Sequence, residues 1–165
     1  MKNSNIVKLD DIDIQILGLL QSDATQSIQD IADKVALTSN PCWRRIKRLE
    51  DVGVIKRRVA VIDAAKVGLG MTAFVRIHTE KHTKDWLLSF KSAVTKIPEI
   101  IECHRMTGDV DYYLKIIVQD LQHYDAVYQR LLDLVSDIKD VSAAFSMEKM
   151  KGDGGVDVGT AWYAE

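Results

Sequence analysis

Apolar residues in the first third of the chain recur at the spacing of an amphipathic helix in two successive segments, residues 9–21 and 27–36. Aspartates open the first segment, where carboxylates complement the free N–H groups of a helix start. Ser27 opens the second segment and is a good N-cap. The pattern predicts two short helices, each burying one face. The apolar positions are Leu9, Ile12, Ile16, Leu19 and Leu20 in the first, and Ile28, Ile31, Ala32 and Val35 in the second.

A third helix is predicted after the turn at residues 37–40. Ser39 or Asn40 can cap it, and its first turn accommodates Pro41. Gly53 suits the left-handed position that follows a helix end. At about 100° per residue, three apolar side chains share one face and the charged ones point elsewhere. The apolar face carries Cys42, Ile46 and Leu49, the opposite face Asn40, Arg44, Lys47 and Asp51, and the flanks Trp43 and Arg48.

Two residues of this helix have alternative interpretations. The thiol of Cys42 lies near the helix start beside arginines, where its pKa could fall, but its apolar position favours a small core residue. Trp43 either covers the edge of a small core or contacts DNA. The sequence leaves the choice for Trp43 open.

After Gly53 the chain changes to a strand pattern. Residues 54–63 are predicted to form a strand with Lys56, Arg57 and Arg58 near its start, like the wing of a winged helix placed to touch phosphates. Residues 63–70 contain two glycines and are interpreted as a hinge.

From residue 71 onward, strand and helix periods alternate. The predicted order is the ferredoxin-like β-α-β-β-α-β, with four antiparallel strands and both helices on one face. The predicted class is therefore α+β, with an N-terminal winged helix-turn-helix and a C-terminal ferredoxin-like βαββαβ sandwich domain. Strands are expected at residues 71–80, 99–107, 109–119 and 141–150, and helices at residues 83–97 and 120–137.

The strand at residues 109–119 has apolar side chains on both faces, with Tyr113 and Ile117 opposite Leu114 and Ile116. Because the helices cover only one face, the other is expected to be buried by sheet-to-sheet dimerisation, which also suits a palindromic DNA site.

These patterns divide the chain into four parts. We expect a winged helix-turn-helix DNA-binding domain at residues 1–62 and a hinge at 63–70. An effector-binding and oligomerisation domain follows at residues 71–150, and a glycine-rich tail occupies residues 151–165.

Charge distinguishes the two modules. Residues 1–62 carry ten Lys/Arg and eight Asp/Glu, which is +2, and residues 63–165 carry twelve and sixteen, which is −4. Residues 39–58 alone carry seven basic and two acidic side chains. Such a run is often only a solvated helix face, but after a capped helix and a turn it favours double-stranded DNA as the partner.

Composition adds an expected location. The chain is 47% hydrophobic and 28% charged, as in ordinary globular proteins. No apolar run approaches the roughly 18–20 residues of a membrane span, and the N-terminus lacks the apolar core of a signal peptide. We expect a cytoplasmic protein with no membrane partner.

Catalysis is not indicated. The four histidines show no metal-ligand spacing, the two cysteines lie far apart, and no phosphate loop or nucleophile elbow occurs. We expect no enzyme, no cofactor and no metal site. Asp109 and Asp111, in the sequence TGDVD, either belong to a plain hairpin turn or offer carboxylates beside backbone N–H groups, which suits a zwitterion.

The sequences LTSNPCWRRIKRLEDVGVI and MTGDVDYYLKI resemble the Lrp/AsnC, or feast/famine, transcriptional regulators. The resemblance spans about residues 9–150. It implies a regulator that binds specific promoter DNA and responds to a small effector such as an amino acid. It also implies dimers that gather into tetramers or octamers.

The resemblance further implies a set of site residues. Base or groove contacts fall on Asn40, Trp43, Arg44, Lys47 and Arg48, and phosphate contacts on Thr38, Ser39, Arg57 and Arg58. Effector contacts fall on Thr107, Gly108, Asp109 and Asp111. Two other classes stay open: a DNA-wrapping architectural protein, and a metabolite-sensing domain for a partner enzyme.

Overall fold

A computed structural model describes residues 6–152 and Val156. The described residues form two compact units: one includes residues 6–61 together with Lys151, Gly152 and Val156, and the other runs from Ile62 to Met150. Each unit has its own hydrophobic core.

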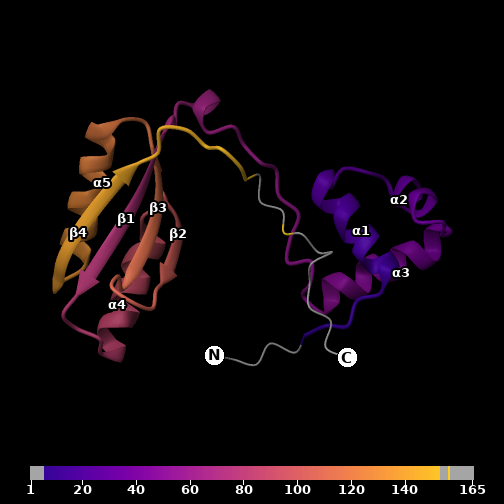
Figure 1. The fold of residues 1–165 in the computed structure, drawn as a ribbon, viewed down its shortest axis with the longest axis horizontal. Helices are drawn as coiled ribbons and strands as arrows, with labels where there is room; N and C mark the ends of the chain where they lie inside the picture. The colour runs from indigo at the N-terminus through magenta and orange to yellow at the C-terminus, as the bar shows by residue number, and fades with distance from the viewer. Residues whose placement is uncertain (1–5, 153–155, 157–165) are drawn as a thin grey trace. The chain divides into compact units, whose positions relative to one another are not determined.

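In the described part of the first unit lie the three helices that Figure 1 labels, and the first two are closed at their N-termini by capping boxes. The side chain of Asp10 caps the first helix and that of Ser27 caps the second, so the predicted cap at Ser27 is confirmed. The helices are α1 (Asp11–Ser22), α2 (Ile28–Lys34) and α3 (Ser39–Asp51).

The core of this unit is built from one face of each helix. Cys42, Ile46 and Leu49 of α3 are at most 2% exposed, which confirms the predicted apolar face and the core interpretation of Cys42. The other fully buried apolar residues are Ile16, Leu17, Ile31, Ala32 and Val35. Burial raises the pKa of the Cys42 thiol, so this cysteine is a packing residue rather than a reactive one.

The start of α3 differs from the prediction. Its N-cap is Thr38, whose side chain makes no cap hydrogen bond, and neither Ser39 nor Asn40 takes that position. The Ser39 hydroxyl is instead hydrogen-bonded to the side chain of Gln29 on α2. Gly53 adopts the expected left-handed conformation (φ 77°) just after the helix.

The predicted strand at residues 54–63 is wrong. Val54 and Ile55 pack on the helical core, and Ile55 N–H donates to the Leu49 carbonyl. Beyond them Val59 and Val61 are exposed, and no described residue pairs with this segment as a ladder partner. Alternating apolar residues alone cannot form a strand, because the backbone groups of a strand need a neighbour.

The second unit is a two-layer sandwich whose sheet has the strand order β2-β3-β1-β4, antiparallel throughout. Figure 1 shows α4 and α5 together on one side of that sheet, which confirms the predicted ferredoxin-like arrangement. The elements are β1 (Met71–Thr79), α4 (Lys84–Lys96), β2 (Ile100–Arg105), β3 (Tyr112–Val118), α5 (Leu121–Leu134) and β4 (Ile138–Phe145).

Alternation along the strands sorts the side chains between core and open face. Ala73, Val75 and Ile77 of β1 point into the helical layer and are at most 1% exposed. Trp86 and Phe90 of α4 stack at 5.0 Å within the same core. The Trp86 indole N–H donates to the Ser136 carbonyl at 2.7 Å, so its polar atom is satisfied inside the core.

Element ends and the predicted hinge need small corrections. The helix predicted to reach residue 137 ends at Leu134, since Val135 is already extended, and the last strand begins and ends earlier than expected. Within residues 63–70 a 3₁₀ turn, η1 (Ala65–Val67), precedes a left-handed Gly68. None of the helices in the described ranges has the length and apolarity of a membrane span.

Candidate nucleic-acid interface and effector turn

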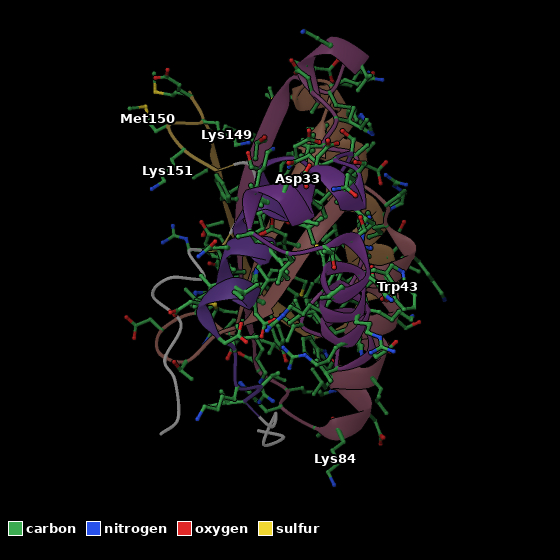
Figure 2. The ribbon with its side chains drawn as sticks, turned by 90° about the vertical axis from the view of Figure 1, so that its right-hand side faces the viewer. Asp33, Trp43, Lys84, Lys149, Met150 and Lys151 are labelled. Atoms are coloured by element: carbon green, nitrogen blue, oxygen red, sulfur yellow. The ribbon has the colours of Figure 1, made fainter. Side chains whose placement is uncertain are left out.

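The face of α3 opposite its buried side carries the basic residues of the opening module. Arg44 and Lys47 are exposed, and Asn40 near the helix start is exposed as well. Trp43 lies beside them with 52% of its surface open (Figure 2), so most of its ring is not used to cover the core. The helix therefore offers a polar, cationic surface next to a rigid apolar seam.

The cations of α3 differ in their partners. Among the residues described, Arg44 has no ion-pair partner. Lys47 contacts Asp51 one turn later at 3.0 Å, and this carboxylate raises the pKa of the Lys47 ammonium. Both members of that pair are more than half exposed, so water or another anion can replace Asp51 as the partner of Lys47 at little cost.

Arg48 has a different partner. Its guanidinium donates to the carboxylate of Asp13 on α1, and that carboxylate is only 2% exposed. Arg45, which the sequence analysis did not single out, donates to the other oxygen of Asp13 at 2.9 Å and to Asp10 at 2.6 Å. Two arginines of α3 are thus joined to the first turn of α1.

The α1 carboxylates serve both the helix cap and the ion pairs. Asp10 accepts the Asp13 backbone N–H at 2.8 Å. That bond, followed by the Arg45 guanidinium, lowers the pKa of the Asp10 carboxyl. Hydrogen bonding to Asp10 in turn raises the pKa of Arg45. A shallow hollow of about 650 Å³ adjoins the cluster, with Lys8 and Pro41 among its lining residues.

The predicted phosphate contacts lie at the two ends of α3. Thr38 is exposed at the start of the helix, whereas Ser39 is partly buried against Gln29. Beyond the other end, Arg57 is exposed and Arg58 contacts Glu50 at 3.2 Å. Because the predicted wing strand is absent, Arg57 and Arg58 lie on an extended segment rather than on a ladder.

The turn between β2 and β3 separates the predicted effector residues into two environments. Thr107, Gly108 and Asp109 are exposed, with Gly108 in a conformation that favours glycine (φ 105°). Among the described residues, the N–H groups of these three donate to no other group. They form an open surface of donors next to a carboxylate.

Asp111 is occupied within its own unit. One carboxylate oxygen accepts the Thr79 backbone N–H at 2.9 Å, and the other lies 2.9 Å from Nε2 of His82. The Thr79 N–H, followed by His82, lowers the pKa of the Asp111 carboxyl. Asp111 therefore ties the turn to the end of β1 instead of projecting with Asp109.

Family models match both units. A winged helix-turn-helix DNA-binding model matches residues 9–56, and the Lrp/AsnC ligand binding domain matches residues 72–156. The fold and the two matches define a two-module transcriptional regulator, with one module for DNA and one for a ligand.

Named relatives agree with this class. The glutamate uptake regulatory protein of Zymomonas mobilis is 49% identical over 146 residues, which cover 88% of each chain. The DNA-binding transcriptional activator DecR of Escherichia coli is 46% identical over 143 residues, 87% of this chain and 94% of that one.

Solved structures extend the likeness to three dimensions. An AsnC family regulator from Agrobacterium tumefaciens has a TM-score of 0.88 at 44% identity, covering 92% of this chain and 98% of its own. A regulator from Neisseria meningitidis in complex with L-Met has a TM-score of 0.86 at 30% identity, covering 92% and 97%. The chain belongs to the Lrp/AsnC family of transcriptional regulators.

Proposed function

We propose that this regulator reads its DNA site with the exposed basic face of α3, and that an amino acid bound at the β2–β3 turn modulates the binding. The observation that carries the proposal is the orientation of α3. Its apolar face, formed by Cys42, Ile46 and Leu49, is at most 2% exposed. Arg44 and Lys47 on the opposite face are therefore free to enter a major groove.

The contacts have distinct roles. Arg44 and Asn40 suit base edges, because a guanidinium pairs with guanine and an amide with adenine. Lys47 lies on the same face as these two, Trp43 lies on one flank, and Arg48 lies on the other flank, where it is bound to Asp13. Thr38, Ser39, Arg57 and Arg58 are assigned to phosphates, since they lie at the two ends of the helix and beyond them.

The proposal is tested with the double variant Arg44→Ala, Lys47→Ala in a gel shift against a DNA site selected in vitro with the wild-type protein. Loss of two groove contacts is expected to weaken binding by about 2–5 kcal/mol. Lys84→Ala is the matched control, because Lys84 is an exposed lysine on α4 (Figure 2), outside the proposed interface. Undiminished retention by the double variant would refute the proposal.

An amino acid fits the turn by its two charges. The free N–H groups of residues 107–109 suit its carboxylate, and the exposed Asp109 carboxylate suits its ammonium group. The L-Met complex of the Neisseria relative supports this ligand class. In this proposal Asp111 holds the turn in shape for the ligand through Thr79 and His82.

Self-association completes the proposal. On the sheet face that the helices leave open, Phe74 and Tyr113 stack at 6.0 Å and Ile117 is only partly buried. We assign this face to a second copy of the chain, since an aromatic and aliphatic surface gains free energy when it is covered. Larger assemblies, tetramers or octamers, are built from such dimers.

We also propose a division of the chain into a DNA-binding domain at residues 1–62, a linker at 63–70, an effector-binding and oligomerisation domain at 71–150 and a tail at 151–165. Most of the tail lies outside the described residues. The place of action is the cytoplasm, where bacterial promoter DNA is found, and neither catalysis nor a cofactor is part of the proposal.

A further inference from the structure

The proposed reading of DNA by α3 gives no part in DNA binding to one buried charge, the carboxylate of Asp13, which also accepts the Asp10 backbone N–H in the capping box of α1. Asp13 is 1% exposed, although it lies only two residues into α1. Both of its carboxylate oxygens accept hydrogen bonds from arginines of α3, Oδ1 from Arg45 and Oδ2 from Arg48. A carboxylate so far removed from water is retained only where its partners are fixed.

We propose that Asp13 is a specificity-determining positioning residue: as an internal counter-ion, it keeps Arg45 and Arg48 from binding DNA phosphates and holds α3 on α1. The inference rests on the proposed function, because it concerns how α3 meets DNA. It assigns Arg48 to orientation of the helix, and it leaves Arg44 as the arginine of α3 that binds DNA directly.

The contrast with Lys47 supports this assignment. Asp51, the partner of Lys47, has 60% of its side chain exposed, so a DNA phosphate can take its place and water can solvate it. Asp13 has 2% exposed. Releasing Arg48 would leave part of a buried charge uncompensated, so a phosphate competes poorly for that guanidinium.

Keeping two arginines of α3 away from DNA phosphates changes the specificity of DNA binding as well as its affinity. Non-specific binding grows with the number of cations that can reach phosphates, whereas specific binding also depends on base contacts in a fixed orientation. Two arginines with free guanidinium groups on α3 would strengthen attachment to any duplex. When Asp13 holds the two arginines, non-specific affinity stays low and the ratio of specific to non-specific binding stays high.

Asp13→Asn tests the inference, with Asp11→Asn as its matched control. Both substitutions remove one negative charge from the same helical turn, but Asp11 is exposed and no arginine contacts it in the described structure. Fluorescence anisotropy would measure binding to the selected site and to an unrelated duplex over a range of salt concentrations. Circular dichroism would verify folding.

For Asp13→Asn we expect stronger binding to the unrelated duplex, a salt slope steeper by about one to two phosphate contacts, and a preference for the selected site that falls about tenfold. Asp11→Asn should leave the preference within about twofold of wild type. A merely structural Asp13 would weaken binding to both duplexes without steepening the slope, and that result would overturn the inference.

The outcomes separate this inference from the proposed function. A wild-type protein without preference for its selected site would overturn both. A wild-type protein with a preference that Asp13→Asn preserves would overturn the inference alone.

A second pair of variants decides the matter if Asp13→Asn does not fold. Arg57→Gln, which removes an exposed arginine assigned to a phosphate, should lower the salt slope for the selected site by about one contact. Arg48→Gln should lower it by less than about half a contact, because Arg48 is neutralised by Asp13. Equal reductions in the two variants would overturn the inference.

Discussion

At the scale of single residues, the three arginines and the one lysine of α3 differ more by their surroundings than by their chemistry. Arg44 is exposed without an ion-pair partner among the described residues, Lys47 has a replaceable partner, and Arg48 has a buried one. The same distinction separates Asp109 from Asp111 in the effector turn. Exposure of the partner, more than the presence of an ion pair, determines which group is available to a ligand.

Asp111→Ala should destabilise the fold at pH 7 by about 1–3 kcal/mol, because the buried Thr79 would lose the acceptor of its backbone N–H. The folded pKa of Asp111 lies below the ordinary value of 3.8. Its contribution is therefore complete above that pH and is lost as the pH falls through the folded pKa. Urea unfolding of wild type and variant at several pH values measures this difference.

The control for this prediction is Asp109→Ala, which removes an exposed carboxylate and should change the free energy of unfolding by less than about 0.5 kcal/mol. A difference between wild type and Asp111→Ala that stays constant from pH 7 down to pH 3 would contradict the linkage.

Residue orientation was predictable from the sequence, but residue pairing was not. A 3.6-residue period places Cys42, Ile46 and Leu49 on one face whatever else the chain does. The contacts of Arg45 and Arg48 with Asp13 join residues more than 30 positions apart, and they depend on how α1 crosses α3. The sequence indicates only a helix-start role for the aspartates at the beginning of α1, and nothing in their spacing indicates arginine partners.

At the scale of elements, local signals predicted every α-helix of the described residues and the four strands of the sheet, but not the 3₁₀ turn η1, because caps and periodicity act within a few residues. The prediction of a wing strand was wrong because strand formation does not depend on local signals alone. Residues 54–63 have the composition of a strand, but a strand depends on a ladder partner elsewhere. A turn was predictable at Gly108 and Asp109, but the strands on both sides of it are shorter than predicted, and the use of Asp111 to anchor the turn to β1 was not predictable.

A prediction at the scale of elements concerns the β2–β3 turn, the proposed effector site. Asp109→Ala should abolish the heat of amino-acid binding in calorimetry while leaving DNA binding without effector within about twofold of wild type, since the proposed ammonium contact is lost and α3 is untouched. Asp133→Ala, which removes an exposed carboxylate from α5, is the control. A screen of the twenty amino acids without heat for the wild type would rule out this ligand class.

At the scale of the whole molecule, a net charge of −2 conceals a basic DNA module and an acidic ligand module. Dimerisation through the open sheet face of the second module would bury its aromatic and aliphatic side chains. A dimer would also present two α3 helices, which suits a two-fold symmetric DNA site. Sequence alternation predicted that face, because β3 carries apolar side chains on both sides.

If the proposed dimer forms through the open sheet face, Phe74→Glu should give a monomer in sedimentation equilibrium where the wild type gives a dimer, because a carboxylate would be buried against the aromatic face of the partner. Leu88→Glu, on an exposed leucine of α4, is the control and should leave the dimer intact. An unchanged mass for Phe74→Glu would show that the copies associate through another surface.

The central claim is that the exposed face of α3 contacts bases, and methylation interference tests it most directly. Methylation of guanine N7 in the selected site should block the wild-type protein at particular guanines. Arg44→Ala should become insensitive to methylation at one of those guanines in each half-site, because the guanidinium that contacts N7 is gone. An interference pattern that is identical for wild type and Arg44→Ala would contradict the account.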